Sequence, residues 1–349
     1  MTVRENLEAA LRGEPVEQIP FALYDGFFNG AAGPALREIE GLGAINTARP
    51  WECAYESVQV ETRELPDGAD LTVYTTPVGE LSQRRSIESG YGSMWTLEHL
   101  VKRPEDWRVV QYIIEDTHYA PAPEAFEDAD ERMGEQGIVM ASVERMPFQR
   151  LWIEFGDIEQ LCYLLADDRD KLDRMISAMT LKQVDCWKLV AQSDAEFVWA
   201  PDNLTSDLLG PELYRRYAQP YYEALAEVVH AHHKLIVAHF DGHLAALAEL
   251  IAATPIDVVE SFTPPPNGNI SLREAWQAWA PKVLWVNYPP SGHLAEPEQI
   301  KARVKKLVAE VPEWRRLAFE LSEDVPEDLV AINCAAIQET LEELAEGAD

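Results

Sequence analysis

The run His239-Phe240-Asp241 places an imidazole and a carboxylate at a spacing that can do chemistry. It follows the apolar residues LIVA, which are typical of a buried β-strand. Successive side chains of a strand point to opposite faces, so His239 and Asp241 share a face while Phe240 points away. Such a pair can bind a metal ion or act as an acid and base. The alternative is that Asp241 caps the following helix and His239 is a hydrogen-bonded core residue.

Polar residues recur at the ends of other apolar runs, where barrel enzymes carry their ligand-binding residues. In this sequence they are Asp25, Asp202, Asn203, Glu260, Asn287 and Glu323. Asp and Asn are also common in turns, so Asp202 and Asn203 have a local structural alternative. Glu260 is either a site residue or a solvated loop residue. Tyr24 and Phe28, near the first run, either wall an aromatic substrate or belong to the core.

These runs alternate with stretches of helical periodicity. The predicted strands are 19–24, 138–143, 196–201, 234–240, 256–261, 282–288 and 315–321. The predicted helices are 3–12, 157–166, 170–192, 211–233, 243–253, 271–280, 296–309 and 326–346. The alternation predicts an α/β protein with a parallel sheet, and its length and repetition favour a (β/α)8 TIM barrel as a single domain, residues 1–349. No Gly-rich dinucleotide or P-loop motif follows any strand, so those cofactor sites lack their signature.

Two regions depart from the alternation. Residues 56–96 contain short alternating runs split by PDG and TPVG, which predict antiparallel hairpins as a small excursion from the barrel. Residues 115–136 are acidic and contain prolines, and we expect a mobile surface loop there. Capping boxes at Thr2–Glu5 and Ser271–Glu274 mark two predicted helix starts.

The formal net charge is −32, which repels phosphate backbones and anionic membranes. We therefore expect neither nucleic acid nor a membrane as a partner, and no apolar run reaches the length of a transmembrane helix. The N-terminal segment lacks the apolar stretch of a secretory signal. The 4 cysteines have no CxxC spacing, which favours a reducing compartment. A cytoplasmic protein is expected, and a homodimer is left open.

Four segments are distinctive in combination: RENLEAALRGEPVEQIP, PDNLTSDLLGPELYRRYAQPYYEAL, HFDGHLAALAELIAATPIDVVESFTPPPNGNISLREA and FELSEDVPEDL. Their succession resembles the uroporphyrinogen decarboxylase-like superfamily, which includes cobalamin-dependent methyltransferases. The resemblance covers most of the chain and implies a (β/α)8 barrel. True uroporphyrinogen decarboxylases carry an arginine-rich segment near the first strand, whereas PFALYDGFFNGAAG has no arginine before Arg37. A polycarboxylate tetrapyrrole is therefore not an expected substrate.

The methyltransferase branch typically binds zinc through His-x-Cys and a later Cys. In this sequence His239 stands at the histidine, Asp241 at the first cysteine and Glu323 at the second. The resemblance implies one of two outcomes. Either zinc is bound by His239, Asp241 and Glu323, since zinc accepts nitrogen and oxygen ligands, or the metal is lost and the three side chains are acid–base or binding groups.

With carboxylates in place of thiolates, a zinc ion would be a stronger Lewis acid toward a substrate oxygen. We therefore expect a methyltransferase that moves a methyl group from a small-molecule methoxy donor to a corrinoid, as an O-demethylase component. The expected catalytic residues are His239, Asp241, Glu323 and Asp25, and the expected substrate-binding residues are Tyr24, Phe28, Asp202, Asn203, Glu260 and Asn287. No D-x-H-x-x-G motif occurs, so the corrinoid is expected on a partner protein. The alternatives are a metal-free decarboxylase or lyase of a small carboxylic acid and a non-catalytic binding protein.

Overall fold

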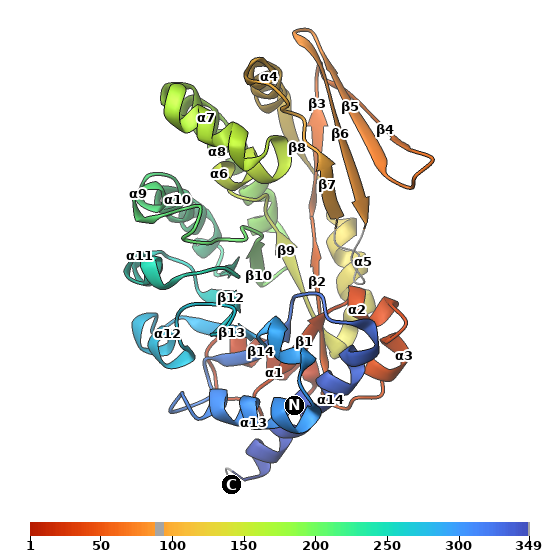
Figure 1. Ribbon diagram of the computed structural model, residues 1–349, viewed down its shortest axis with the longest axis vertical. Coiled ribbons are helices and arrows are strands. Elements are labelled where there is room, and N and C mark those ends of the chain that lie inside the picture. Colours follow the sequence, from red (N-terminus) through yellow and green to blue (C-terminus); the bar gives the residue numbers. More distant parts are fainter. Residues whose placement is uncertain (88–93, 348–349) are drawn as a thin grey trace.

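A closed barrel of 8 parallel strands forms the centre of the computed structural model, which describes residues 1–87 and 94–347. Around the barrel the order is β1, β14, β13, β12, β11, β10, β9 and β2, and β2 closes the ring against β1. The barrel strands are β1 (Phe21–Tyr24), β2 (Gly43–Ala48), β9 (Gly137–Ser142), β10 (Phe197–Ala200), β11 (Leu235–His239), β12 (Val258–Phe262), β13 (Val283–Asn287) and β14 (Leu317–Leu321). The predicted (β/α)8 barrel is confirmed (Figure 1).

Strand β2 is the one barrel strand that the apolar runs do not predict. Its sequence, GAINTA, contains a single large apolar side chain, that of Ile45. Ile45 is fully buried inside the barrel, and β2 pairs along its length with β1 and β9. Tertiary pairing therefore makes a strand of a segment whose local pattern is weak.

Helices cover the outside of the barrel and most follow the predicted stretches (Figure 1). The helices, including short 3-10 and π turns, are α1 (Val3–Leu11), α2 (Gly26–Asn29), α3 (Gly33–Leu36), η1 (Pro104–Asp106), α4 (Trp107–Asp116), α5 (Glu124–Met133), η2 (Gly134–Gln136), α6 (Pro147–Arg150), η3 (Leu151–Phe155), α7 (Ile158–Asp167), α8 (Arg169–Gln192), α9 (Pro211–Leu213), η4 (Tyr214–Ala218), α10 (Gln219–His230), η5 (Ala245–Leu247), α11 (Ala248–Ala253), α12 (Leu272–Ala278), η6 (Pro290–Leu294), α13 (Pro297–Val308) and α14 (Glu327–Glu346). Both predicted capping boxes are confirmed, since Thr2 and Ser271 accept the backbone N–H groups of Glu5 and Glu274.

Alternate residues of the barrel strands point inward, and their chemistry changes along the barrel axis. The amino-terminal part of the interior is an apolar cluster: Leu7, Ala10, Leu11, Ala22, Ile45, Ile138, Met140, Phe197, Val237, Val258, Val283, Trp285 and Ala318. Helix α1 supplies the first three of these side chains and packs against the amino-terminal end of the barrel. The next inward-facing residues, toward the carboxyl ends of the strands, are mostly polar, so the functional site is to be sought there.

Between β2 and β9 the chain leaves the barrel and forms two antiparallel sheets. Strand β3 (Trp51–Tyr55) pairs with β8 (Thr117–Pro121), and a four-stranded sheet contains β4 (Gln59–Glu64), β5 (Asp70–Thr76), β6 (Gly79–Ile87) and β7 (Met94–Glu98). The predicted antiparallel region over 56–96 is confirmed, except for residues 88–93, which lie outside the described residues. The four-stranded sheet projects at the end of the molecule opposite the C-terminus (Figure 1).

The prediction of a loop over 115–136 is wrong. Strand β8 and helix α5 occupy most of that segment. Only Phe126 and Ala129 of α5 are buried, so its apolar stripe is too narrow to be seen among the surrounding acidic residues. Strand β8 owes its conformation to β3, which pairs with all five of its residues.

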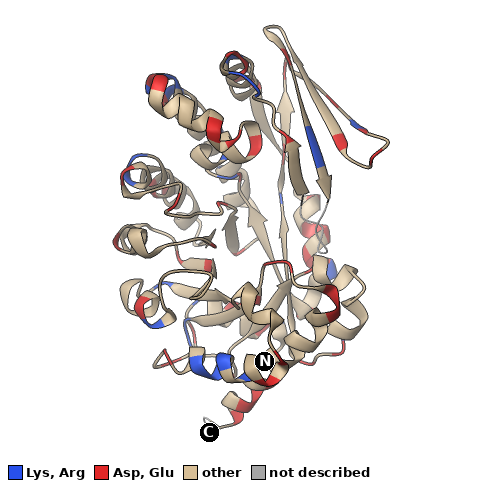
Figure 2. Cartoon of the chain, viewed as in Figure 1, with Lys and Arg blue, Asp and Glu red and all other residues tan. Residues whose placement is uncertain are grey.

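Acidic side chains are spread over many of the outer helices and are not confined to one element (Figure 2). Within the described ranges, no helix combines the length and the apolar character needed to cross a membrane. Many of the acidic residues thus lie on the outer helices. The charged side chains inside the barrel need partners of their own.

Candidate active site

A cluster of mostly polar side chains fills the mouth of the barrel. His239 of β11 lies opposite Glu260 of β12 in the parallel register, and Glu320 of β14 lies opposite Asn287 of β13. Each stands two residues beyond an inward-facing apolar residue of its own strand, so strand alternation directs all of them into the same space. We call the following side chains the mouth cluster: Tyr24, Trp199, His239, Asp241, Glu260 and Glu320.

His239 lies between two carboxylates. Its Nδ1 is 2.7 Å from Oε2 of Glu260, and its Nε2 is 3.6 Å from Oδ2 of Asp241. Burial disfavours the charged imidazole, but the charge of Glu260 and the contacts with both carboxylates outweigh burial and hold the pKa of His239 well above its ordinary value. The side chain is therefore an imidazolium at neutral pH, with a proton on each ring nitrogen.

Glu260 is the central acceptor of the cluster and is fully buried. The hydroxyl of Tyr24 donates to its Oε1 at 2.7 Å, and the indole of Trp199 donates to its Oε2 at 3.2 Å. Burial acts to raise the pKa of this carboxyl, yet His239 and the two donors bring the pKa below its ordinary value. Glu260 is thus an ionised counter-charge to His239 and not a solvated loop residue.

Glu320 is the protonated member of the cluster. Its Oε1 accepts the backbone N–H of Ser261 at 2.6 Å, and its Oε2 is buried without a hydrogen-bond partner among the described residues. Burial, together with the nearby charge of Glu260, raises the pKa of Glu320 well above its ordinary value. Two buried carboxyl groups side by side do not both ionise, so Glu320 keeps its proton while Glu260 loses its own.

Asp241 is held in place from two other loops. Nδ2 of Asn203 donates to Oδ2 of Asp241 at 3.0 Å, and Nη2 of Arg145 donates to Oδ1 of Asn203 at 2.9 Å. Asn203 has a φ of 44°, in the left-handed region that Asn tolerates better than most residues. Burial acts to raise the pKa of Asp241, but His239 and Asn203 lower it. The loops after β9, β10 and β11 are therefore joined into one polar network.

Asp202 and Asn287, both expected to bind substrate, lie beside the cluster and hold loops together. Asp202 accepts the backbone N–H of Met146 at 2.6 Å and the hydroxyl of Tyr222. Nδ2 of Asn287 donates to Oγ1 of Thr263 at 3.1 Å. Both side chains belong to fully buried residues, so their visible role is to fix the loops that carry the mouth cluster.

The comparison with protein families agrees with this architecture. The model of the uroporphyrinogen decarboxylase (URO-D) family matches residues 153–344, more than half of the chain. The chain belongs to this family. A methyltransferase from Methanosarcina mazei has a TM-score of 0.61 at 14% identity over 99% of both chains, which shows a shared fold. The GH20 catalytic modules of a pneumococcal exo-β-D-N-acetylglucosaminidase are more distant, with a TM-score of 0.41 at 8% identity over 96% of this chain and 86% of that one. No curated protein sequence matches.

In this URO-D family protein the three side chains expected to bind zinc do not form a metal-holding group. In the part of the chain that the structure describes, no group of three or more His, Cys, Asp and Glu side chains is arranged to hold a metal ion. Nδ1 of His239 is engaged by Glu260 at 2.7 Å, so only Nε2, at 3.6 Å from Asp241, could reach a metal. Glu323 is half-buried on the loop after β14, and its burial and the charge of Asp241 raise its pKa. Zinc binding by these three residues therefore stays a prediction.

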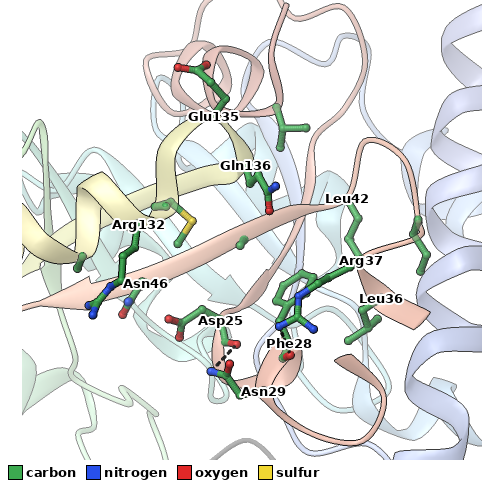
Figure 3. Close-up of a pocket in the computed structure, with 15 residues that line it drawn as sticks. Asp25, Phe28, Asn29, Leu36, Arg37, Leu42, Asn46, Arg132, Glu135 and Gln136 are labelled. Carbon is green, nitrogen blue, oxygen red and sulfur yellow. Dashed lines mark hydrogen bonds between the residues drawn. The ribbon is translucent and has the colours of Figure 1, made fainter. Parts of the chain in front are cut away.

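Asp25 and Phe28 do not join the mouth cluster. Tyr24 faces into the barrel, so the next residue, Asp25, turns to the outside of the strand. Asp25 and Phe28 line a separate cavity between the barrel wall and helix α5 (Figure 3). The structure thus separates both residues from His239, with which the sequence grouped them.

The site predicted from sequence leaves out three members of the network: Trp199, Arg145 and Glu320, of which Glu320 is recognised as a polar residue at a strand end but given no role. Trp199 and Glu320 were open to prediction, because each stands two residues beyond an inward-facing apolar residue, Phe197 and Ala318. Arg145 carries no such signal, since it lies on a loop after β9 and meets Asn203 only in the folded chain.

Proposed function

We propose that this protein is a methyltransferase that moves a methyl group from a neutral, methoxy-type compound to a reduced corrinoid carried by a partner protein. The observation that carries the proposal is the imidazole of His239, held between Glu260 at 2.7 Å and Asp241 at 3.6 Å. It lies at the carboxyl end of the barrel strands, where catalytic residues of such barrels are found. The fold shared with the Methanosarcina methyltransferase is consistent with the proposal.

His239 would act as the acid. A methoxy group is a poor methyl donor because an alkoxide or phenolate must leave, and proton transfer to that oxygen lowers the barrier. The distance of 3.6 Å between Nε2 and Oδ2 of Asp241 is longer than a hydrogen bond. This N–H can therefore donate to a substrate oxygen. The C–O bond breaks as the methyl group passes to the corrinoid, the electron pair stays on the oxygen, and the oxygen takes the proton of His239.

The charge of the mouth favours a neutral donor over a carboxylic acid. Two ionised carboxylates, Glu260 and Asp241, surround one imidazolium. The guanidinium of Arg145 is already engaged by Asn203 and lies 3.8 Å from Glu154. A substrate carboxylate would meet net repulsion, which speaks against the alternative of a small-acid decarboxylase.

Aromatic rings beside His239 suit an aromatic methoxy compound. The ring of Trp199 meets His239 edge to face at 5.9 Å between centroids, and Tyr24 meets Trp199 at 6.3 Å. Both aromatic residues are only half-buried, unlike the core aromatics. Offset and edge-on ring contacts of this kind stabilise aromatic ligands.

The test is a spectroscopic assay with the purified protein, a reduced corrinoid protein and a panel of methoxylated aromatic and aliphatic compounds. We expect the methyl-corrinoid spectrum with at least one aromatic methyl ether. His239→Gln should slow its formation by about 10²–10⁴-fold, whereas the control His243→Gln, on a half-exposed histidine paired with Asp207 at 3.0 Å, should leave it unchanged.

Two outcomes would overturn parts of this proposal. Absence of methyl-corrinoid across the whole panel would contradict methyl transfer itself. Stoichiometric zinc in the wild type that is lost in His239→Ala would contradict the proton-donor role of His239 and restore the metal-assisted version.

A further inference from the structure

A polar cavity lies on the outer side of the barrel, apart from the mouth cluster. It has a volume of about 700 Å³ and is bordered by β1, β2, α2, α3 and α5 (Figure 3). Single-turn helices α2 and α3, instead of a full-length helix, join β1 to β2, and the cavity lies between them and α5. Asn46 faces the cavity because its neighbour Ile45 points into the barrel.

The cavity lining includes two acidic side chains, Asp25 and Glu135, and two basic side chains, Arg37 and Arg132 (Figure 3). The guanidinium of Arg37 donates to the backbone oxygen of Phe28, whereas Asp25 and Arg132 are not paired with each other. Asp25 lies half-buried after β1, and Arg132 lies in the last turn of α5. Burial raises the pKa of Asp25, and the backbone N–H of Gly26 and the charge of Arg132 oppose this only in part. Neither side chain forms an ion pair within the described chain, although Asp130 of the same helix is paired with Arg4 at 2.8 Å.

Amide groups and an apolar wall complete the lining. The side-chain amides of Asn46 and Gln136 have no hydrogen-bond partner among the described residues, and each can donate and accept. The opposite part of the cavity is formed by Phe28, Leu36 and Leu42. The lining thus offers both charges, spare amides and an apolar surface.

We propose that this outer cavity binds a small zwitterion, an α-amino acid or short peptide with an apolar side chain. Its ammonium group would pair with Asp25, its carboxylate with Arg132, and its side chain would lie against Phe28, Leu36 and Leu42. Because acidic and basic side chains both line the cavity, a zwitterion can meet an opposite charge at each of its ends. The volume lies within the range of small-ligand pockets. The proposal is independent of the chemistry at the mouth.

The test is isothermal titration of the full-length protein with L-leucine and L-leucyl-L-leucine, each compared with its N-acetyl and its amide derivative. We expect a zwitterionic form to bind and both blocked forms to bind at least tenfold more weakly, because each lacks one charge. Asp25→Asn and Arg132→Gln should each weaken binding by about 10- to 100-fold, the range of a lost charge-assisted hydrogen bond.

Two control variants keep the result interpretable. Arg103→Gln, on an exposed arginine outside the cavity, and His239→Gln, in the mouth cluster, should both leave binding unchanged. Circular dichroism of every variant establishes that it is folded. Failure of both zwitterions to bind, equal binding of a blocked form, or binding that survives in both Asp25→Asn and Arg132→Gln would overturn the proposal.

Discussion

Two histidines are buried near the carboxyl end of the barrel, and their surroundings make one of them charged and the other neutral. His239 is 8% exposed and has carboxylates facing both ring nitrogens. His293, in η6 after β13, is fully buried, with its Nδ1 at 3.4 Å from the amide of Asn333 and its ring edge-on to Tyr288 at 4.8 Å. Burial lowers the pKa of His293 to about 4, whereas that of His239 is well above its ordinary value.

This difference shows that the groups which neighbouring elements bring to His239 and His293, and not burial, decide whether each imidazole is charged. Burial acts on both histidines in the same direction, against the charged form. Strand β12 brings Glu260 beside His239, and the loop after β11 brings Asp241. Helix α14 brings the uncharged amide of Asn333 to Nδ1 of His293. His239 is therefore a buried proton donor because the register of β11 and β12 places Glu260 beside it.

The largest expected effect on stability comes from removing Glu260, the carboxylate that His239 has and His293 lacks. Glu260→Ala leaves a buried imidazolium and the donors Tyr24 and Trp199 without their shared carboxylate. We expect the free energy of unfolding in urea at pH 7 to fall by about 3–5 kcal/mol, as when one partner of a buried ion pair is lost. Glu38→Ala, on the exposed surface, should change it by less than about 0.5 kcal/mol. A loss below about 1 kcal/mol in Glu260→Ala would contradict a charged His239.

A smaller effect is expected at His293 as the pH falls. Its folded pKa of about 4 lies below the ordinary 6.5, so below pH 6.5 the unfolded chain binds more protons and stability declines until about pH 4. Between pH 6.5 and 5 this amounts to about 2 kcal/mol. Urea unfolding of wild type and His293→Gln across that range measures it as the difference between their pH slopes. Parallel slopes would show that His293 is not buried in its neutral form.

The smallest effect concerns the support of Asp241. Asn203→Gly keeps the left-handed backbone but removes the amide that donates to Asp241, whereas Asn203→Ala also strains the φ of 44°. Both variants should lose methyl-transfer activity to a similar extent, about tenfold for one lost hydrogen bond. The alanine variant should in addition be about 1 kcal/mol less stable than the glycine variant. Equal stability, measured by urea unfolding, would remove the argument for strain at Asn203.

Much of the barrel could be predicted from sequence because its strands are short apolar runs between helical stretches. Strand β2 and helix α5 could not, since Ile45 is the only large apolar residue of one and only Phe126 and Ala129 are buried in the other. Their conformations depend on partners far away in the chain.

The alternation of side chains along each strand was the part of the candidate site that could be predicted. It places His239 inward, and the same rule, applied to β1, would have placed Tyr24 inward and Asp25 outward. The ion pair of His239 with Glu260 depends on the register of two strands, and the support by Arg145 depends on a loop contact. Neither has a signal in the local sequence.

The role of His239 as the acid is tested most directly by single-turnover methyl transfer with donors whose leaving groups differ in acidity. We expect the rate defect of His239→Gln to be below about tenfold for a nitrophenyl methyl ether, which needs little help from an acid. The defect should grow to about 10²–10⁴-fold for alkyl methyl ethers, whose leaving oxygen must be protonated. A defect of equal size for all donors would contradict proton donation by His239.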